Sequence, residues 1–362
     1  MNNLCLYSMR ALAVGLLAAS ASGPAMSAES ALVTNQGDIS PMCGTKPMVV
    51  GLSDGYGGET WRKTAAAELK DEVSRCKNLK KFMYTNANGD QQKANSDINS
   101  MVAQGVNVLV VFPDFGAAQI PAMRAATKAG VTVVPYLAKI PGTPGKDYAA
   151  NVTEDVYRMG VVWADWYGQN LKKGNVVFLG GAPGAMSSQI FMDGFKTGLA
   201  KYPDLKLLEN NFVVTNWNPV DAQKAVAGLI AKYQHIDGVA TDYGVTALST
   251  VKAFEQANLA IPAIATNASN NELNCKYIAM KKSGKGFGYF SLDGTTSVIR
   301  FAGRRAVADY QGTKNSEPTM AFPYPYADSA KGVDPKCDPS APPDADFSSA
   351  LSAEKLKAVF QQ

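Results

Sequence analysis

Between residues 80 and 137, the hydrophobic and polar positions form strand-like and helix-like patterns in alternation. The segment KKFMYT leads into NANGDQQKANSDINSMVAQG, where Ile98, Met101 and Val102 fall at helical spacing. VNVLVVF then forms a continuous β-branched and aromatic run, typical of a strand that helices cover on both faces. A second helix-like segment, PDFGAAQIPAMRAATKAG, precedes the strand-like VTVVPYL. This order predicts parallel α/β architecture.

The pattern continues on both sides of this stretch. MVVGL at 48–52 predicts the first strand, and a helix follows from about 60 to 76. After the Gly- and Pro-rich passage at 140–145, a second series begins with NVVFLG and continues with LKLLENNFVV, DGVAT and IPAIAT. We therefore predict two doubly wound lobes, one over 45–150 and one over 151–291, with the first crossover near 148–153. Residues 317–362 read as a tail, rich in Pro and Asp up to 343, that packs on the second lobe.

Ligands of such open sheets bind beyond the carboxyl ends of the strands. Residues 86–89 and 113–116 follow two predicted strands directly, so they are candidate edges of a binding cleft.

The amino terminus has the form of a cleavable secretory signal. Arg10 supplies positive charge, residues 11–19 are apolar, and Gly23-Pro24 precedes the small-residue site at 25–27. No later stretch approaches the roughly 20 apolar residues that a transmembrane helix needs. We expect removal of residues 1–27 and a soluble exported protein made of the remaining 335 of 362 residues.

Charge and cysteine content narrow the function further. Without Arg10, 34 basic residues face 31 acidic ones and form no polybasic block, so nucleic-acid binding has no support. Four cysteines remain after processing and allow three pairings. Disulfides are more typical of an exported protein than four buried thiols. The local pair Cys43–Cys76 is favoured, which leaves Cys275 for Cys337.

Enzyme signatures are mostly missing. His235 is the only histidine and precedes a predicted strand, so it is expected in a solvated loop. No nucleophile elbow or phosphate loop occurs. GGAPG at 180–184 could hold an anion on backbone amides, but a plain strand-to-helix turn is favoured. No catalytic residue, metal or cofactor is predicted.

The run TNANGDQQKANSDINSMVAQGVNVLVVFP resembles the ribose and simple-sugar binding proteins that serve bacterial ABC importers. The likeness extends to about Thr313 and implies the type I periplasmic binding protein fold, with a multi-strand hinge. It also implies that the chain crosses back near Asn267 and residues 291–293, which would return 292–316 to the first lobe.

The resemblance also suggests ligand-binding positions. Trp61-Arg62 is similar to a Trp-Arg pair of the galactofuranose-type branch, and Trp217 occupies a slot for an aromatic ring. Aromatic rings suit the apolar face of a sugar and polar groups suit its hydroxyls. The ordinary alternatives are core packing, helix caps and turns. The full candidate set is Ser53, Trp61, Arg62, Gln189, Trp217, Asp242, Asn267 and Asp293.

Several of these positions depart from the family pattern. Gln189 stands where the ribose type has an arginine, and Tyr243 replaces Asp242 if the register slips by one. Relatives end the fourth strand with an Asp-Arg pair, but this chain has Leu137-Ala138, or Lys139 after a slip. The identity of the sugar is therefore not predicted.

The sequence predicts a monomeric periplasmic receptor that closes by hinge motion on a monosaccharide, polyol or similar small molecule. The closed form would deliver this ligand to an ABC permease of the inner membrane. The alternative is a receptor for chemotaxis or a sensor kinase. An exported enzyme on the same fold has little support.

Overall fold

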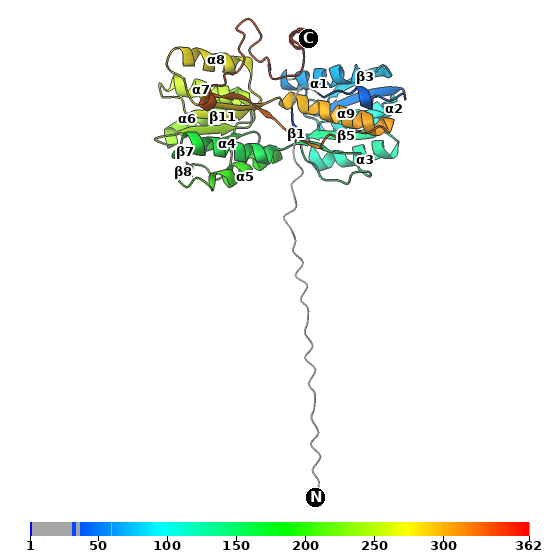
Figure 1. The fold of residues 1–362 in the computed structure, drawn as a ribbon, viewed down its shortest axis with the longest axis horizontal. Coiled ribbons are helices and arrows are strands. Elements are labelled where there is room, and N and C mark those ends of the chain that lie inside the picture. Colours follow the sequence, from blue (N-terminus) through cyan, green and yellow to red (C-terminus); the bar gives the residue numbers. More distant parts are fainter. Residues whose placement is uncertain (2–30, 34–36, 59, 362) are drawn as a thin grey trace.

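A computed structural model describes residues 1, 31–33, 37–58 and 60–361. Apart from Met1, the predicted export signal lies outside the described residues. Two α/β lobes lie side by side, each with a central sheet between helices (Figure 1). This architecture confirms the predicted fold class.

The first sheet has seven strands, all paired in parallel. In spatial order they are β1 (Ala31–Leu32), β13 (Met320–Phe322), β6 (Val152–Glu154), β5 (Thr132–Leu137), β4 (Val108–Val111), β2 (Met48–Asp54) and β3 (Leu79–Asn86). The helices of this lobe are η1 (Ser40–Met42), α1 (Thr60–Val73), α2 (Gln91–Ala103), η2 (Gly116–Gln119), α3 (Ile120–Lys128), η3 (Thr295–Ser297) and α9 (Val298–Gln311).

The second sheet is parallel except at one edge, where β14 runs antiparallel to β12. Its strands follow the order β14 (Tyr324–Asp328), β12 (Tyr289–Asp293), β11 (Ala263–Asn267), β10 (Gly238–Thr241), β7 (Gly174–Gly180) and β8 (Leu205–Leu207), and β9 (Val213–Val214) also pairs with β7. Its helices are α4 (Val156–Asn170), α5 (Met186–Leu199), α6 (Pro219–Lys232), α7 (Gly244–Gln256), α8 (Asn271–Lys282) and η4 (Ser329–Lys331).

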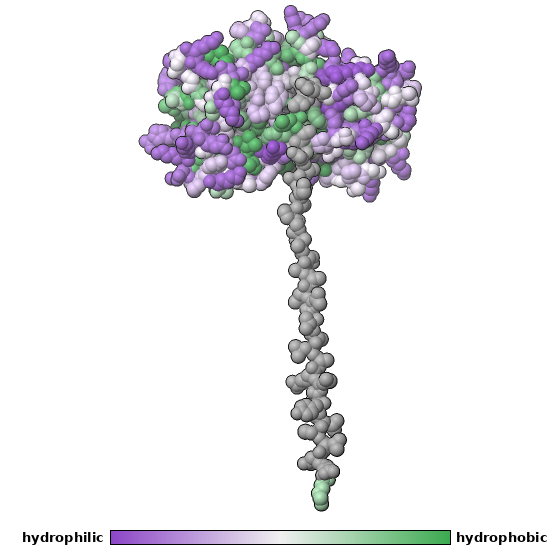
Figure 2. Space-filling model, viewed as in Figure 1, coloured by the Kyte–Doolittle hydropathy of each residue, from purple (hydrophilic) through white to green (hydrophobic). Residues whose placement is uncertain are grey.

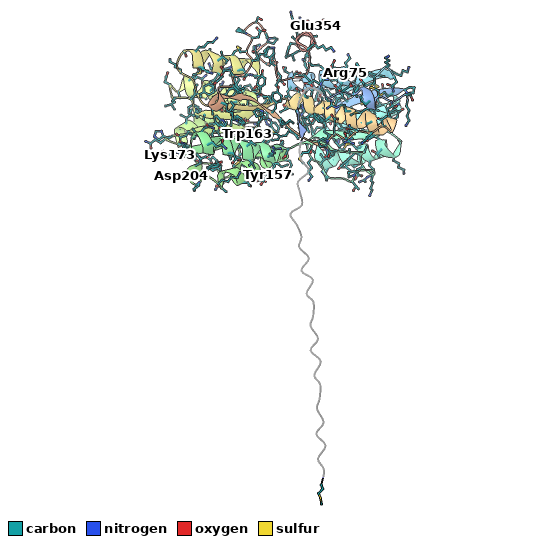
Figure 3. The ribbon with its side chains drawn as sticks, in the orientation of Figure 1. Arg75, Tyr157, Trp163, Lys173, Asp204 and Glu354 are labelled. Atoms are coloured by element: carbon teal, nitrogen blue, oxygen red, sulfur yellow. A yellow bond between two sulfur atoms is a disulfide. The ribbon has the colours of Figure 1, made fainter. Side chains whose placement is uncertain are left out.

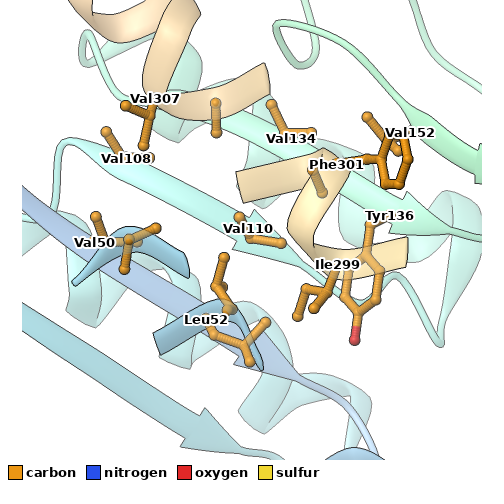
Figure 4. Close-up of a cluster of buried hydrophobic side chains, with 14 of the residues drawn as sticks. Val50, Leu52, Val108, Val110, Val134, Tyr136, Val152, Ile299, Phe301 and Val307 are labelled. Carbon is orange, nitrogen blue, oxygen red and sulfur yellow. The ribbon is translucent and has the colours of Figure 1, made fainter. Parts of the chain in front are cut away.

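Aliphatic side chains of the first sheet pack against α1 and α9, as Figure 4 shows for Val50, Val110 and Ile299. All four residues of β4 are buried, which explains the unbroken apolar run of its sequence. In the second lobe, Trp163 of α4 (Figure 3) stacks on Phe191 of α5 with ring centroids 5.1 Å apart. On the face shown in Figure 2, hydrophilic residues dominate the outer surface of both lobes.

Helices α4 and α5 approach closely because glycine stands at their contact. A Cβ atom at Gly194 would lie 2.0 Å from the carbonyl oxygen of Tyr157, and one at Gly160 would lie 2.2 Å from that of Phe191. Real side chains do not fit at such distances, so these two glycines permit the packing.

Up to β14, the described chain passes between the lobes three times: from β6 to α4, from β12 to η3, and from β13 to β14. The first passage comes after Glu154 because β6 pairs with β5 and therefore belongs to the first sheet. The predicted boundary at residue 151 falls before this strand. β6 has only three residues, which is too short for the hydrophobic pattern to reveal it.

The carboxy-terminal segment differs from the predicted tail in contacting both lobes. It contributes β13 to the first sheet and β14 to the second. Further on, the Asn271 side chain of α8 donates to the Asp338 carbonyl, and Glu68 of α1 accepts from Ser349. The last helix of the described residues is α10 (Ala353–Val359), which carries the Glu354 labelled in Figure 3 and whose Lys355 pairs with Asp71 of α1 in the first lobe.

Disulfides join Cys43 to Cys76 and Cys275 to Cys337. This is the pairing that the sequence favoured. The first bond ties η1 to the end of α1, and the second ties the carboxy-terminal segment to α8. Each bond lowers the entropy of the unfolded chain and should add about 3 to 4.5 kcal/mol by the loop-closure model.

Candidate functional site

The carboxyl ends of both sheets lie at the boundary between the lobes. Two passages leave directly from strand ends, after β6 in the first sheet and after β12 in the second. Because the strands of a parallel sheet share one direction, their other carboxyl ends lie at the same edges. Polar groups at these two edges are therefore the candidates for binding a ligand.

Buried polar atoms at the first edge have no hydrogen-bond partner among the described residues. They include the Ser53 hydroxyl and one Asp54 carboxylate oxygen at the end of β2, and the Tyr136 hydroxyl near the end of β5. These three side chains are at most 1% exposed. An unpaired buried polar group costs free energy, so native proteins keep few of them. Ser53 was predicted from the resemblance, whereas Asp54 and Tyr136 were missed.

Arg62 lies between two carboxylates at this edge. Its Nη1 donates to Asp54 Oδ1 at 2.7 Å, and its Nη2 donates to Asp114 Oδ1 at 2.8 Å. The guanidinium lies 3.4 Å from the centroid of the Phe112 ring. Burial acts to lower the pKa of Arg62, but Asp114 and Asp54 raise it above its usual value. Burial raises the pKa of Asp54, opposed by Arg62.

Trp61 connects the same edge to the passage after β12. Its indole Nε1 donates to the Thr295 hydroxyl at 2.7 Å, and its ring meets Phe112 edge-on. The side chain is half-buried and packs against the core of the first lobe. A structural role for Trp61 is therefore evident, and stacking on a ligand stays a prediction.

At the second edge, Trp217 and Asp242 form one unit. Trp217 Nε1 donates to Asp242 Oδ1 at 3.0 Å, and the Ser188 hydroxyl donates to the other carboxylate oxygen. Trp217 is 38% exposed, whereas Asp242 is buried. Burial raises the pKa of Asp242 to about 6, although both hydrogen bonds oppose this shift. Ser188 was missed because nothing in its sequence context distinguishes it.

The GGAPG turn at 180–184 leaves space for the indole ring of Trp217. A Cβ atom at Gly181 would lie 2.0 Å from the Trp217 ring, and the Gly181 amide donates to Ser188. Trp217 has a φ of +50°, which few residues other than glycine adopt readily. Such strain is typical of positions that serve a function.

Asn267 and Asp293 lie at the ends of neighbouring strands, β11 and β12. The Asn267 Oδ1 is buried without a hydrogen-bond partner among the described residues. Asp293 differs, because it accepts from the Ser269 amide and hydroxyl and from the Ser291 hydroxyl. Asp293 also lies at the passage between the lobes, and its role in ligand binding stays a prediction.

Glu154, which sequence reasoning missed, ends β6 at the first passage. Its Oε1 is buried without a partner within the described chain. Burial raises the pKa of Glu154 to about 8, with added repulsion from Asp155 and Asp293.

Other candidate positions turn away from the two edges or carry no polar group. Gln189 on α5 donates to Asp193 of its own helix and is half-buried, although it lies one residue from Ser188. Leu137 ends β5 with a φ of +69°, and Lys139 is exposed beyond it. His235 is exposed, as predicted.

A surface hollow of about 550 Å³ lies elsewhere in the second lobe, between α6 and the segment before β9. It is lined by residues such as Phe212 and Tyr233 and includes no predicted site residue. Among the described residues, no three His, Cys, Asp or Glu side chains group as metal ligands. No helix within the described ranges is long and apolar enough to cross a membrane.

Two α/β lobes with the carboxyl ends of their strands at the boundary between them are the architecture of a two-lobed binding protein. The model of the periplasmic binding protein domain family matches residues 50–289, so the chain belongs to that family. Membership implies a periplasmic location.

Curated relatives and solved structures agree with this assignment. The chain is 28% identical to the xylitol-binding protein of Mycolicibacterium smegmatis over 68% of its own length and 67% of that protein. It is 26% identical to the D-xylose-binding periplasmic protein of Escherichia coli, over 56% of this chain and 60% of the relative. The fold is similar to that of an ABC transporter periplasmic solute-binding protein from Actinobacillus succinogenes with bound D-allose: TM-score 0.64, 21% identity, 77% and 96% of the two chains covered. These relatives are named as binding proteins rather than enzymes.

Proposed function

We propose that this protein is a periplasmic receptor that binds one sugar or sugar-like polar molecule between its two strand-end edges. Hinge closure would bring the edges together, and the closed form would deliver the ligand to an ABC permease. The proposal includes a cleavable signal over residues 1–27, a monomeric receptor and no catalytic activity.

The observation that carries the proposal is the set of buried polar atoms left without partners at both edges. Ser53, Asp54 and Tyr136 supply them in the first lobe, and Asn267 does so in the second. Hydroxyl groups of a sugar both donate and accept, so they can satisfy carboxylate, amide and hydroxyl groups together. These atoms lack hydrogen bonds in the folded protein, so hydrogen bonds to a ligand would contribute to the free energy of binding.

The aromatic residues fit the same ligand. Trp217 is partly exposed at the second edge and Trp61 half-buried at the first, so each offers a ring to the apolar face of a sugar. The names of the relatives support a pentose or polyol among the possible ligands.

A thermal-shift screen tests the proposal. The panel contains D-xylose, xylitol, D-allose, amino acids and a dipeptide. A matching sugar at about 100 times its dissociation constant should stabilise the protein by roughly 2.7 kcal/mol. A panel in which only amino acids or peptides raise the melting temperature would contradict the sugar assignment.

A receptor that reports to a sensor kinase or chemoreceptor would have the same site. Reconstitution with a permease and its ATPase discriminates the two, because a transport receptor should stimulate ligand-dependent ATP hydrolysis.

A further inference from the structure

Resting on the proposed function, we infer that the site selects uncharged polyhydroxylated ligands and rejects the corresponding sugar acids, and that Asp54 and Asp114 are the residues responsible. They would do so by occupying Arg62, the cation that a ligand carboxylate would otherwise bind.

The first step of the argument is the geometry of Arg62. A guanidinium recognises a carboxylate best when two parallel N–H groups are available. Here Nη1 donates to both Asp54 and Asp114, and Nη2 donates to Asp114. One face of the guanidinium is covered by Phe112, whose ring centroid lies 3.4 Å from the Arg62 Cζ. Both terminal nitrogens and one face are therefore committed to the protein itself.

The second step is that the backbone fixes the two carboxylates. Asp114 Oδ2 accepts from the Gly55 amide at 3.0 Å, and Asp54 Oδ1 accepts from the Tyr56 amide at 3.2 Å. A Cβ atom at Gly55 would lie 2.4 Å from Asp114 Oδ2, so only glycine lets this carboxylate come so close. Because these bonds hold the carboxylates in place, a ligand cannot easily displace them from Arg62.

The third step is the charge that remains. Two carboxylates against one guanidinium leave one net negative charge when all three groups are ionised. The unpaired Asp54 oxygen, the Ser53 hydroxyl and the Tyr136 hydroxyl are buried beside this group, which suits ligand hydroxyls. Asp242 at the lobe boundary adds a further acidic group. A ligand carboxylate would meet repulsion at close range in a partly buried site, where charges are weakly screened.

Calorimetric titration with neutral and acidic forms of the same sugar tests this inference. Suitable pairs are D-xylose with D-xylonate and D-galactose with D-galacturonate. We expect that the wild-type protein binds the acid of a pair at least 100-fold more weakly than the neutral sugar. Equal or tighter binding of the acid would overturn the inference and leave the proposed function intact. Failure of both members of every pair, together with a negative thermal-shift screen, would contradict the proposed function itself.

The variant Asp114→Asn assigns the effect to its residue. It removes one negative charge and frees part of the guanidinium. The ratio of the affinity for the neutral sugar to the affinity for its acid should therefore fall at least tenfold. Asp165→Asn is the matched control, because Asp165 pairs with Lys201 on the surface of the second lobe. The ratio of the two affinities in this variant should equal that of the wild type. An unchanged ratio in a folded Asp114→Asn protein would overturn the assignment. If that variant does not fold, Asp54→Asn provides the same comparison.

Discussion

Helix α1 contributes to two buried ionic groups in the first lobe that differ in how fully their atoms are paired. In the first group, Arg300 of α9 donates to Glu68, Glu72 and Asp71 of α1, all within 2.9 Å. In the second group, Arg62 of the same helix pairs with Asp54 and Asp114.

In the Arg300 group, the carboxylates are bound by donors of the protein itself. Glu68 also accepts from Thr296, Ser297 and Ser349, so side chains of η3 and the carboxy-terminal segment complete it. The Arg62 group lies at the end of β2 and leaves an Asp54 oxygen and the neighbouring Ser53 and Tyr136 hydroxyls unpaired. Buried charge that is fully paired holds segments together, whereas buried polar atoms left unpaired at a strand-end edge are available to a ligand.

Replacing Arg300 with Met should have the largest effect on stability. The change leaves three acidic side chains without their shared cation, and breaking a buried pair typically costs about 3 to 5 kcal/mol. Ligand affinity should stay within twofold, because Arg300 is not at the strand-end edge.

Arg75→Met is the matched control for this change. Arg75 pairs with Asp71 and Glu72 of the same acidic set at 3.4 Å, but its side chain is 44% exposed. Urea denaturation should show a loss of less than about 1 kcal/mol for this variant. Similar losses in both variants would contradict the distinction between buried and exposed pairs in this group.

Glu154 should make stability depend on pH. Its folded pKa of about 8 lies above the ordinary value of 4.5, so the folded protein retains a proton that the unfolded chain has lost. The free energy of unfolding should therefore fall as pH rises from about 4.5 to 8, on the order of 2 to 4 kcal/mol from this group.

Glu154→Gln removes that proton and should flatten the dependence. Melting curves at pH 5 and pH 8 should show the variant near the wild type at pH 5 and more stable at pH 8. The exposed Glu354→Gln serves as control and should follow the wild type at both values. A constant difference between Glu154→Gln and the wild type would show that Glu154 does not titrate in this range.

Replacing each tryptophan with alanine distinguishes a role in packing from a role in ligand binding. Trp217→Ala should weaken ligand binding by about 2 kcal/mol, close to 30-fold, and change stability little because the ring is partly exposed. Trp61→Ala should also lower the free energy of unfolding by about 2 kcal/mol or more, since its ring packs on the core. Calorimetry and melting curves measure both effects. Normal affinity in a stable Trp217→Ala protein would remove Trp217 from the site.

Much of the fold could be predicted because hydrophobic periodicity reports burial directly. The run VLVV became the fully buried strand β4, and the spacing of Ile98 and Met101 became the buried face of α2. Strand β6 could not be predicted, since three residues carry no periodicity and its position depends on pairing with β5 and β13. The contact of the carboxy-terminal segment with α1 depends on polar bonds to Glu68, which leave no pattern in the sequence.

The candidate site was predictable where local sequence carries the signal. Trp61-Arg62 and Trp217 stand next to strand ends, and the resemblance identified them. Asp114 lies within the predicted cleft edge at 113–116 but was not singled out, and Tyr136 was missed, because their positions near Arg62 depend on the order of β2, β4 and β5 in the sheet. Charge content could not indicate that two aspartates bind one arginine, since that requires distances between residues 52 positions apart.

The central claim is that the unpaired polar atoms at the strand-end edge bind ligand. It is tested most directly by calorimetric titration of Tyr136→Phe and Ser53→Ala with the neutral sugar that gives the largest thermal shift. Each variant removes a buried hydroxyl that has no partner among the described residues, so unfolding free energy should stay equal or rise slightly. Affinity should fall about tenfold, equivalent to roughly 1.4 kcal/mol. Unchanged affinity with reduced stability in both variants would show that these hydroxyls serve the fold and would contradict the account.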